Sequence, residues 1–226
     1  MPLAENLRET LQRIENAAEQ AKRPRPRLLA VSKTQPATAV AALAAAGQRA
    51  FGENYVQEAA IKVRDLVELS LDWHLIGHLQ SNKAELAAQV FDWVETVDRA
   101  KLVTALARYR PADRTPLNVL IQVNIDDEAS KHGCPPQDVP GLAAAIAALP
   151  RLCLRGLMCI PTPHADIEQR RPAFRQMRAL YDALAAQYPQ VDTLSMGMSD
   201  DMALAVAEGS TQVRMGTALF GARVAK

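Results

Sequence analysis

Short apolar runs alternate with helix-like segments along almost the whole sequence of 226 residues. The apolar runs lie near 28–31, 49–51, 72–76, 91–97, 117–125, 152–160, 191–194 and 211–215. The helix-like segments lie near 36–46, 54–69, 81–89, 99–109, 136–148, 166–188 and 199–207. Strands that alternate with helices pair in parallel, because a parallel neighbour requires a crossover connection. Eight such strands predict an α/β fold, namely a closed (β/α)8 TIM barrel.

The segment before the first strand predicts one extra helix at the N-terminal end. In residues 3–21, apolar side chains recur at steps of three and four, which is the stripe of an amphipathic helix. An open, doubly wound sheet is the alternative fold, but the turn after the first strand lacks the Gly-x-Gly-x-x-Gly pattern of dinucleotide-binding sheets. No linker or change in composition divides the sequence, so we expect residues 1–226 to form a single domain.

Charge and composition argue against several classes of function. The 26 Lys and Arg residues nearly balance the 25 Asp and Glu residues, so a net charge of +1 attracts neither nucleic acid nor an anionic membrane. No apolar run approaches the roughly 18 residues of a transmembrane span, and the N-terminal residues lack the apolar core of a signal peptide. The cysteines Cys134, Cys153 and Cys159 have no C-x-x-C spacing, which indicates a reduced, cytoplasmic protein without structural disulfides or a zinc cluster. His74 and His78 lie four residues apart in a strand-like segment, where they form no helical metal pair.

Lys33 follows the first predicted strand and precedes Pro36, which opens the next helix. An ammonium at the end of a central strand must be solvated, paired or deprotonated. One interpretation is that Lys33 extends from its loop into water. The other is an amine with a lowered pKa that condenses with an aldehyde, which arginine cannot do.

Two segments near the C-terminus have the features of an anion site. Ser199 lies between a strand and a helix, where it can be a plain helix N-cap or hold a phosphate together with backbone N–H groups. Gly216 and Thr217 follow the last strand, where a glycine admits a ligand close to the backbone. TIM barrels often bind phosphate after strands seven and eight. Arg214, just before Gly216, can be exposed, paired with an acid, or turned into the barrel mouth.

Six motifs along the sequence resemble those of one known family. They are AVSKT at 30–34, FGENYVQE at 51–58, WHLIGHLQSNK at 73–83, RGLM at 155–158, LSMGMSDD at 194–201 and RMGTALFG at 214–221. In this combination and order the sequence resembles the pyridoxal phosphate homeostasis protein family. The resemblance implies a barrel similar to the N-terminal domain of alanine racemase. It also implies a protein that binds pyridoxal 5'-phosphate without established catalytic turnover and takes part in vitamin B6 homeostasis.

The resemblance also assigns roles to individual positions. Lys33 matches the lysine that forms the Schiff base, and Arg214 matches the arginine that faces the pyridine nitrogen. Ser199, Gly216 and Thr217 match the phosphate contacts. Two further cofactor-binding candidates are Ser195, near the phosphate, and Asn54, near the cofactor.

Two main classes of function remain open. The first is a carrier that holds pyridoxal phosphate on Lys33 and passes it to apo-enzymes or amines. The alternative is a pyridoxal-phosphate-dependent amino-acid racemase, which needs a second acid/base on the opposite face of the substrate. In alanine racemase a tyrosine from another subunit's C-terminal domain has this role, and we expect it to be absent because this sequence ends at Lys226. We therefore expect a monomeric carrier rather than an enzyme. A regulatory binding module is a third class, indicated only by the polar segment 126–136, which we expect to be a mobile loop.

Overall fold

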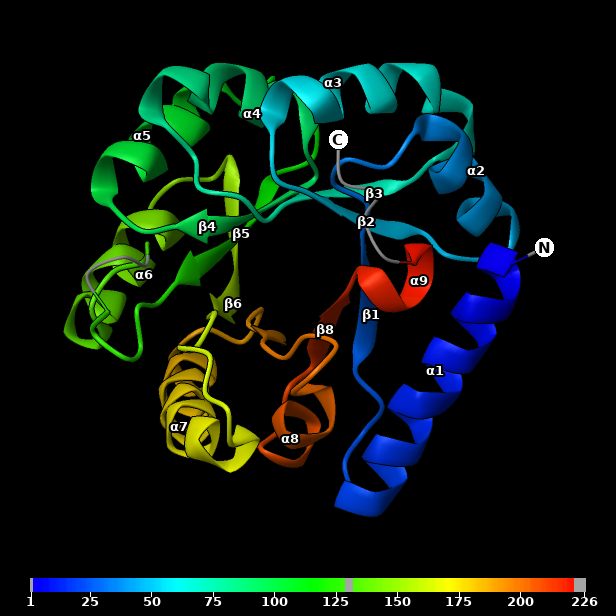
Figure 1. The fold of residues 1–226 in the computed structure, drawn as a ribbon. Coiled ribbons are helices and arrows are strands. Elements are labelled where there is room, and N and C mark those ends of the chain that lie inside the picture. The colour runs from blue at the N-terminus through cyan, green and yellow to red at the C-terminus, as the bar shows by residue number, and fades with distance from the viewer. Residues whose placement is uncertain (1, 129–131, 222–226) are drawn as a thin grey trace.

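The computed structural model describes residues 2–128 and 132–221, and it confirms the predicted barrel. Eight parallel strands form a closed ring in chain order, with helices around its outside (Figure 1). The strands are β1 Arg27–Val31, β2 Ala50–Glu53, β3 Asp72–Leu75, β4 Trp93–Val97, β5 Leu117–Gln122, β6 Leu152–Met158, β7 Thr193–Ser195 and β8 Gln212–Met215. The ring closes where β1 pairs with β8, with Leu28 opposite Val213. This closure excludes the open, doubly wound sheet.

The helices lie where the alternation predicted them, although several begin later than expected. They are α1 Pro2–Ala21, α2 Ala37–Ala45, α3 Val56–Asp65, α4 Ala84–Val90, α5 Ala100–Tyr109, α6 Val139–Ala147, α7 Arg171–Gln187, α8 Met202–Ala207 and α9 Thr217–Phe220. Three of them are preceded by a short 3-10 turn, at 81–83, 136–138 and 167–170. Helix ends often wind this way, so the pattern located each helical segment but not its first α-helical residue.

The N-terminal helix α1 takes the place of a missing outer helix. The short α9 is the only described helix after β8, and α1 lies between α8 and α2 in the ring (Figure 1). Leu7 and Ile14 on the predicted apolar stripe are buried. At one end of α1, the Asn6 side-chain amide donates to the backbone carbonyl of Leu219 in α9 at 2.8 Å. The extra helix therefore completes the outer layer.

The interior of the barrel is polar at its centre. Glu95 on β4 is fully buried and accepts hydrogen bonds from Ser195 on β7 and Gln212 on β8, both at 2.7 Å. His74 Nδ1 on β3 lies 2.7 Å from the same carboxylate, and the His74 ring stacks on that of Trp93. Because β4 lies across the ring from β8, these contacts cross the interior. Most TIM barrels fill this space with branched apolar side chains, so the charged group at the centre is unusual.

The structure also bears on the composition-based expectations. All three cysteines are free thiols, and burial raises the pKa of Cys134 and of Cys159 to about 12. Within the described ranges, no three His, Cys, Asp or Glu side chains are grouped to hold a metal ion. None of the described helices is long and apolar enough to cross a membrane. In the segment expected to be a mobile loop, residues 129–131 lie outside the described residues, so that expectation stays a prediction.

The buried Glu95 leads to a prediction about acid stability. Burial alone would raise its pKa, but the hydrogen bond and attraction of His74, with Arg214 and Ser195, lower the pKa below the ordinary 4.5. The folded state then holds the carboxylate ionised where the unfolded chain would already bind a proton. This contribution to stability is complete above about pH 4.5 and is lost as the pH falls below that value.

We therefore expect Glu95→Gln to lower the free energy of unfolding at pH 7 by about 3 kcal/mol, because it leaves buried donors without their counter-charge. The loss of stability in acid should also become less steep than in the unsubstituted protein. Urea unfolding between pH 3 and pH 7, with the exposed Glu85→Gln as control, measures both effects. Equal acid sensitivity in the Glu95 variant and the unsubstituted protein would contradict this role.

Candidate functional site

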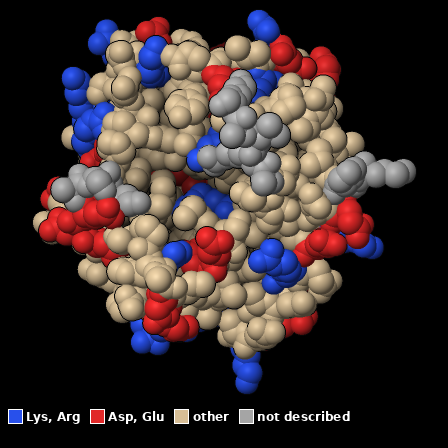
Figure 2. Space-filling view, viewed as in Figure 1, with Lys and Arg blue, Asp and Glu red and all other residues tan. Residues whose placement is uncertain are grey.

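A cavity of about 210 Å³ lies at the C-terminal ends of the strands. Figure 2 shows this face of the molecule hollowed near its centre, with Lys or Arg side chains on the floor of the hollow. Six of the seven residues that the sequence singled out line the cavity. They are Lys33, Asn54, Ser199, Arg214, Gly216 and Thr217. The seventh, Ser195, does not line it.

Lys33 lies two residues beyond the end of β1, in a tight turn. The Ser32 N–H continues the sheet by donating to the Gly52 carbonyl at 2.9 Å, and the Gln35 N–H closes the turn on the Ser32 carbonyl at 3.0 Å. Thr34 has a φ of +65°, which is rare for a β-branched residue. The side chain of Lys33 lines the cavity, as expected for a group at a C-terminal strand end of a TIM barrel.

Arg214 on β8 is buried and held from one side. Its Nη1 donates to the carbonyl and the hydroxyl of Ser195 at 2.9 and 2.8 Å, and its Nη2 donates to the carbonyl of Cys159 at 2.8 Å. A guanidinium has five N–H bonds, so two remain without an acceptor among the described residues. Of the three interpretations left open by the sequence, the structure shows the one in which Arg214 turns into the barrel mouth.

Ser195 therefore lies beneath the cavity rather than in it. Its hydroxyl bonds to both Arg214 and the carboxylate of Glu95, so it links the cavity floor to the barrel interior. The sequence analysis missed Glu95. The available signal was an acid in the middle of an apolar run predicted to be a buried strand.

Ser199 is not a helix N-cap, which was one of the two roles that the sequence left open for it. Helix α8 begins at Met202, and Asp201 closes the preceding turn by accepting the Met198 N–H on its carboxylate at 2.6 Å. Asp201 is itself held by Arg170 at 2.6 Å. The Ser199 side chain makes no hydrogen bond to another described residue and lines the cavity. Asp201, two residues after Ser199, thus occupies the N-cap position without a side-chain bond to a helix N–H, and the Ser199 hydroxyl is not used at the start of the helix.

Asn54 is likewise not the cap of its helix. Helix α3 begins at Val56 after Tyr55, whose side chain is exposed, and Asn54 lines the cavity instead. The loop after β3 packs directly on Asn54: a Cβ on Gly77 would lie 2.2 Å from the Asn54 carbonyl oxygen. Any side chain at position 77 would push the two loops apart, so the glycine fixes Asn54 at the cavity wall.

The loops after β7 and β8 supply hydroxyl and backbone groups. Gly216 and Thr217 lie where β8 leads into α9, and the Thr217 hydroxyl makes no hydrogen bond within residues 2–128 and 132–221. Among the described lining residues, Lys33 and Arg214 are the only ones with charged side chains. The cavity thus combines one amine, one guanidinium and two hydroxyls, a set suited to a small anion that also carries a carbonyl and a hydrogen-bond acceptor.

Comparison with known proteins agrees with this description. The family model "Alanine racemase, N-terminal domain" matches residues 5–224. The pyridoxal phosphate homeostasis protein of Escherichia coli strain K12 is 56% identical over 199 residues, which are 87% of this chain and 85% of that protein. The protein of the same name from Pasteurella multocida is 51% identical over 229 residues, which are 99% of this chain and 98% of that protein.

Solved structures give the same picture. PipY of Synechococcus elongatus PCC7942, solved without PLP, is 38% identical with a TM-score of 0.87, and the match covers 97% of this chain and all of PipY. PipY solved with PLP bound matches over the same shares of the two chains with a TM-score of 0.79. By sequence and by fold, this chain belongs to the family of alanine racemase N-terminal domains and, within it, to the pyridoxal phosphate homeostasis proteins.

Proposed function

We propose that this protein binds pyridoxal 5'-phosphate through Lys33 and keeps it available in the cell, as a carrier in vitamin B6 homeostasis rather than as an enzyme. The observation that carries this proposal is that Lys33, Arg214, Ser199 and Thr217 line the same cavity at one end of the barrel. The names of the close relatives and the PLP-bound PipY structure support it.

The residues of the cavity fit this cofactor. A volume of about 210 Å³ is below the roughly 300–1,000 Å³ of pockets for drug-sized ligands, so it suits a single small ring with short substituents. Bound there, pyridoxal phosphate supplies an aldehyde that condenses with an amine and releases one water. Lys33 is the only lining residue of the described chain with an amine that can take this part.

The phosphate would lie between the loops after β7 and β8. Ser199 and Thr217 can each donate a hydroxyl hydrogen bond there, and Gly216 brings the backbone close to the ligand. These are the loops with which TIM barrels often hold phosphate. The phosphate would thus be bound at one end of the cavity, and Lys33 would bind the aldehyde end of the cofactor covalently.

Arg214 would donate an N–H to the ring nitrogen. A guanidinium is effectively always protonated, so it would offer hydrogen bonds but no proton, and the ring nitrogen would stay neutral. A neutral pyridine draws electrons weakly and gives little help to reactions that pass through a carbanion. The contacts of Arg214 with Ser195 and Cys159 hold the guanidinium at the cavity and support this role.

The cavity also lacks the pair of proton-transferring groups that racemisation requires. Apart from Lys33, its described lining holds no Tyr, His, Cys, Asp or Glu side chain, and arginine does not give up its proton readily. We infer a monomer in the cytoplasm, and the three free thiols support the reducing compartment. Apo-enzymes that require pyridoxal phosphate are the partners we propose for release.

Substitution of Lys33 tests whether pyridoxal phosphate is attached covalently to its amine. We expect Lys33→Ala to abolish the visible absorption band that forms when the protein is mixed with pyridoxal phosphate, because no other lining residue offers an amine. The matched control is Lys101→Ala, which removes an exposed lysine on α5. The proposal would be refuted if the Lys33 variant gave a band of normal height and if borohydride still attached the cofactor to that variant.

Removal of the two hydroxyls tests the phosphate site. We expect Ser199→Ala and Thr217→Ala each to weaken binding of pyridoxal phosphate about tenfold, the loss expected for one hydrogen bond to a charged group. Neither should change the affinity for pyridoxal, which lacks the phosphate. Spectroscopic titrations with both ligands measure this difference, with the exposed Thr104→Ala as control. Equal weakening for both ligands would place the phosphate elsewhere.

Amino-acid turnover separates a carrier from a racemase. Because the described cavity lining offers one amine and no Tyr, His, Cys, Asp or Glu side chain, we expect the loaded protein to racemise enantiopure alanine no faster than free pyridoxal phosphate does. Chiral chromatography of the incubated amino acid provides the measurement. Turnover well above that of the free cofactor would identify an enzyme.

A further inference from the structure

A second lysine, Lys62 on α3, is buried close to the turn that carries Lys33. Its Nζ lies 2.8 Å from each of three acceptors, the Ser32 carbonyl, Glu53 Oε1 and Glu58 Oε1. An ammonium has three N–H bonds, so all of them are used. Lys62 does not line the cavity, and it is therefore not a rival for the reacting amine.

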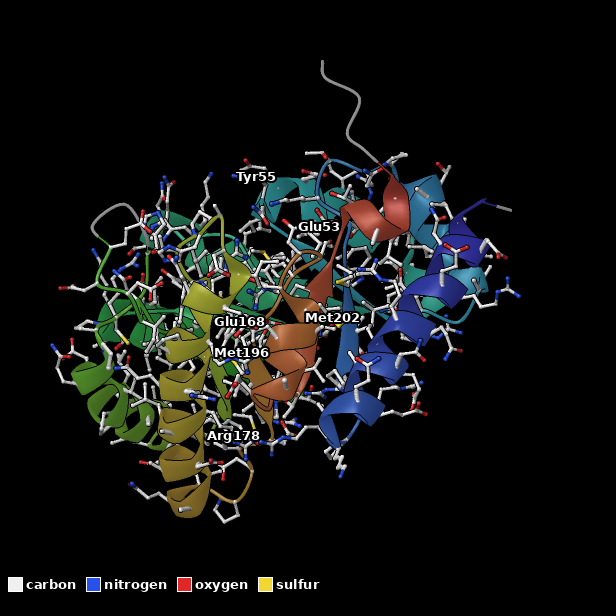
Figure 3. All side chains as sticks on the ribbon, turned by 60° about the horizontal axis from the view of Figure 1, so that its bottom comes forward. Glu53, Tyr55, Glu168, Arg178, Met196 and Met202 are labelled. Atoms are coloured by element: carbon white, nitrogen blue, oxygen red, sulfur yellow. The ribbon has the colours of Figure 1, made fainter. Side chains whose placement is uncertain are left out.

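Lys62 pairs with two carboxylates, and the more buried of them is that of Glu53, at the end of β2. Its side chain is fully buried, and Oε1 also accepts the Ser32 hydroxyl at 2.6 Å, while Oε2 has no partner among the described residues. In Figure 3, Tyr55 lies at the upper edge of the molecule and Glu53 lies lower, near the strand ends. Burial raises the pKa of Glu53 above its ordinary value, although Lys62 and Ser32 act in the opposite direction.

Glu58 connects this cluster to the other side of Lys33. The same Oε1 that meets Lys62 accepts the Thr34 N–H at 2.7 Å. With this contact, Thr34 has a φ of +65°. β-Branched residues avoid this conformation unless their surroundings impose it. Thus Ser32 and Thr34, the two neighbours of Lys33, are both tied to the Lys62–Glu58 pair.

We infer that Glu58 and Lys62 are positioning residues for Lys33: their ion pair holds the backbone on both sides of it in a strained turn that directs its amine into the cavity. This inference rests on the proposed function, because it concerns the approach of that amine to the cofactor aldehyde. A bimolecular condensation inside a protein depends on such placement, and a displacement of about 1 Å can slow a reaction on the order of 100-fold.

Substitution of Glu58 tests the inference in two independent measurements. In the cofactor-free protein, Glu58→Ala should accelerate hydrogen exchange at the Thr34 amide, because its acceptor is gone. When pyridoxal phosphate is added, the visible band should grow at least about tenfold more slowly than in the unsubstituted protein. Glu58→Gln retains an oxygen acceptor and should restore most of both properties.

The control is Asp65→Ala, which removes an exposed carboxylate from the same helix. Lys62→Met is the second variant, expected to slow band growth as Glu58→Ala does. If Lys62→Met fails to fold, the two measurements on Glu58→Ala still test the inference. The Glu58 side chain is partly exposed, and its removal leaves the Lys62–Glu53 pair in place.

The outcomes separate this inference from the proposed function. Normal Thr34 exchange and normal band growth in Glu58→Ala would overturn the inference and leave the proposed function intact. The same would follow if Asp65→Ala slowed loading equally. No band in the unsubstituted protein would overturn the proposed function, and this inference with it.

Discussion

The buried positive charge of Arg214 is the constraint on which the rest of the site depends. A guanidinium at the floor of a cavity cannot lose its proton, so the protein must compensate it where water is scarce. Glu95 provides this compensation from inside the barrel through the hydroxyl of Ser195, while His74 and Gln212 complete the carboxylate's contacts. The polar centre of the barrel is therefore a requirement of the cavity above it rather than a flaw in the core.

Two buried ionic clusters converge on the two cationic side chains of the cavity. The one inside the barrel supports Arg214, and the one between the strand ends and α3 surrounds the turn of Lys33. Both clusters lie outside the cavity lining, whose described residues include Lys33 and Arg214 but no Asp or Glu. Val31, Ile76 and Ile160 contribute apolar side chains to the remaining described wall.

The large features of this structure could be predicted from the sequence because they follow from repetition. Eight apolar runs with intervening helices define the barrel, and the barrel rule then brings residues as distant as Lys33 and Thr217 to one rim. The local details could not be predicted, because they depend on competition between neighbours. Asp201 rather than Ser199 closes the turn before α8, and the hydroxyl of Ser195 points to Glu95 because a buried acid needs donors that no local pattern reveals.

The position of α1 has a consequence for the order in which the chain can fold. Among its described neighbours, α2 follows it closely in sequence, but α8 and α9 come at the opposite end. During synthesis the apolar stripe of α1, which ends at Ala21, is made well before α8, which begins at Met202, and α9, which begins at Thr217. Because contacts of such high sequence separation form late, the outer layer can close only after α8 and α9 have been synthesised, and until then the apolar stripe of α1 lacks these two partners.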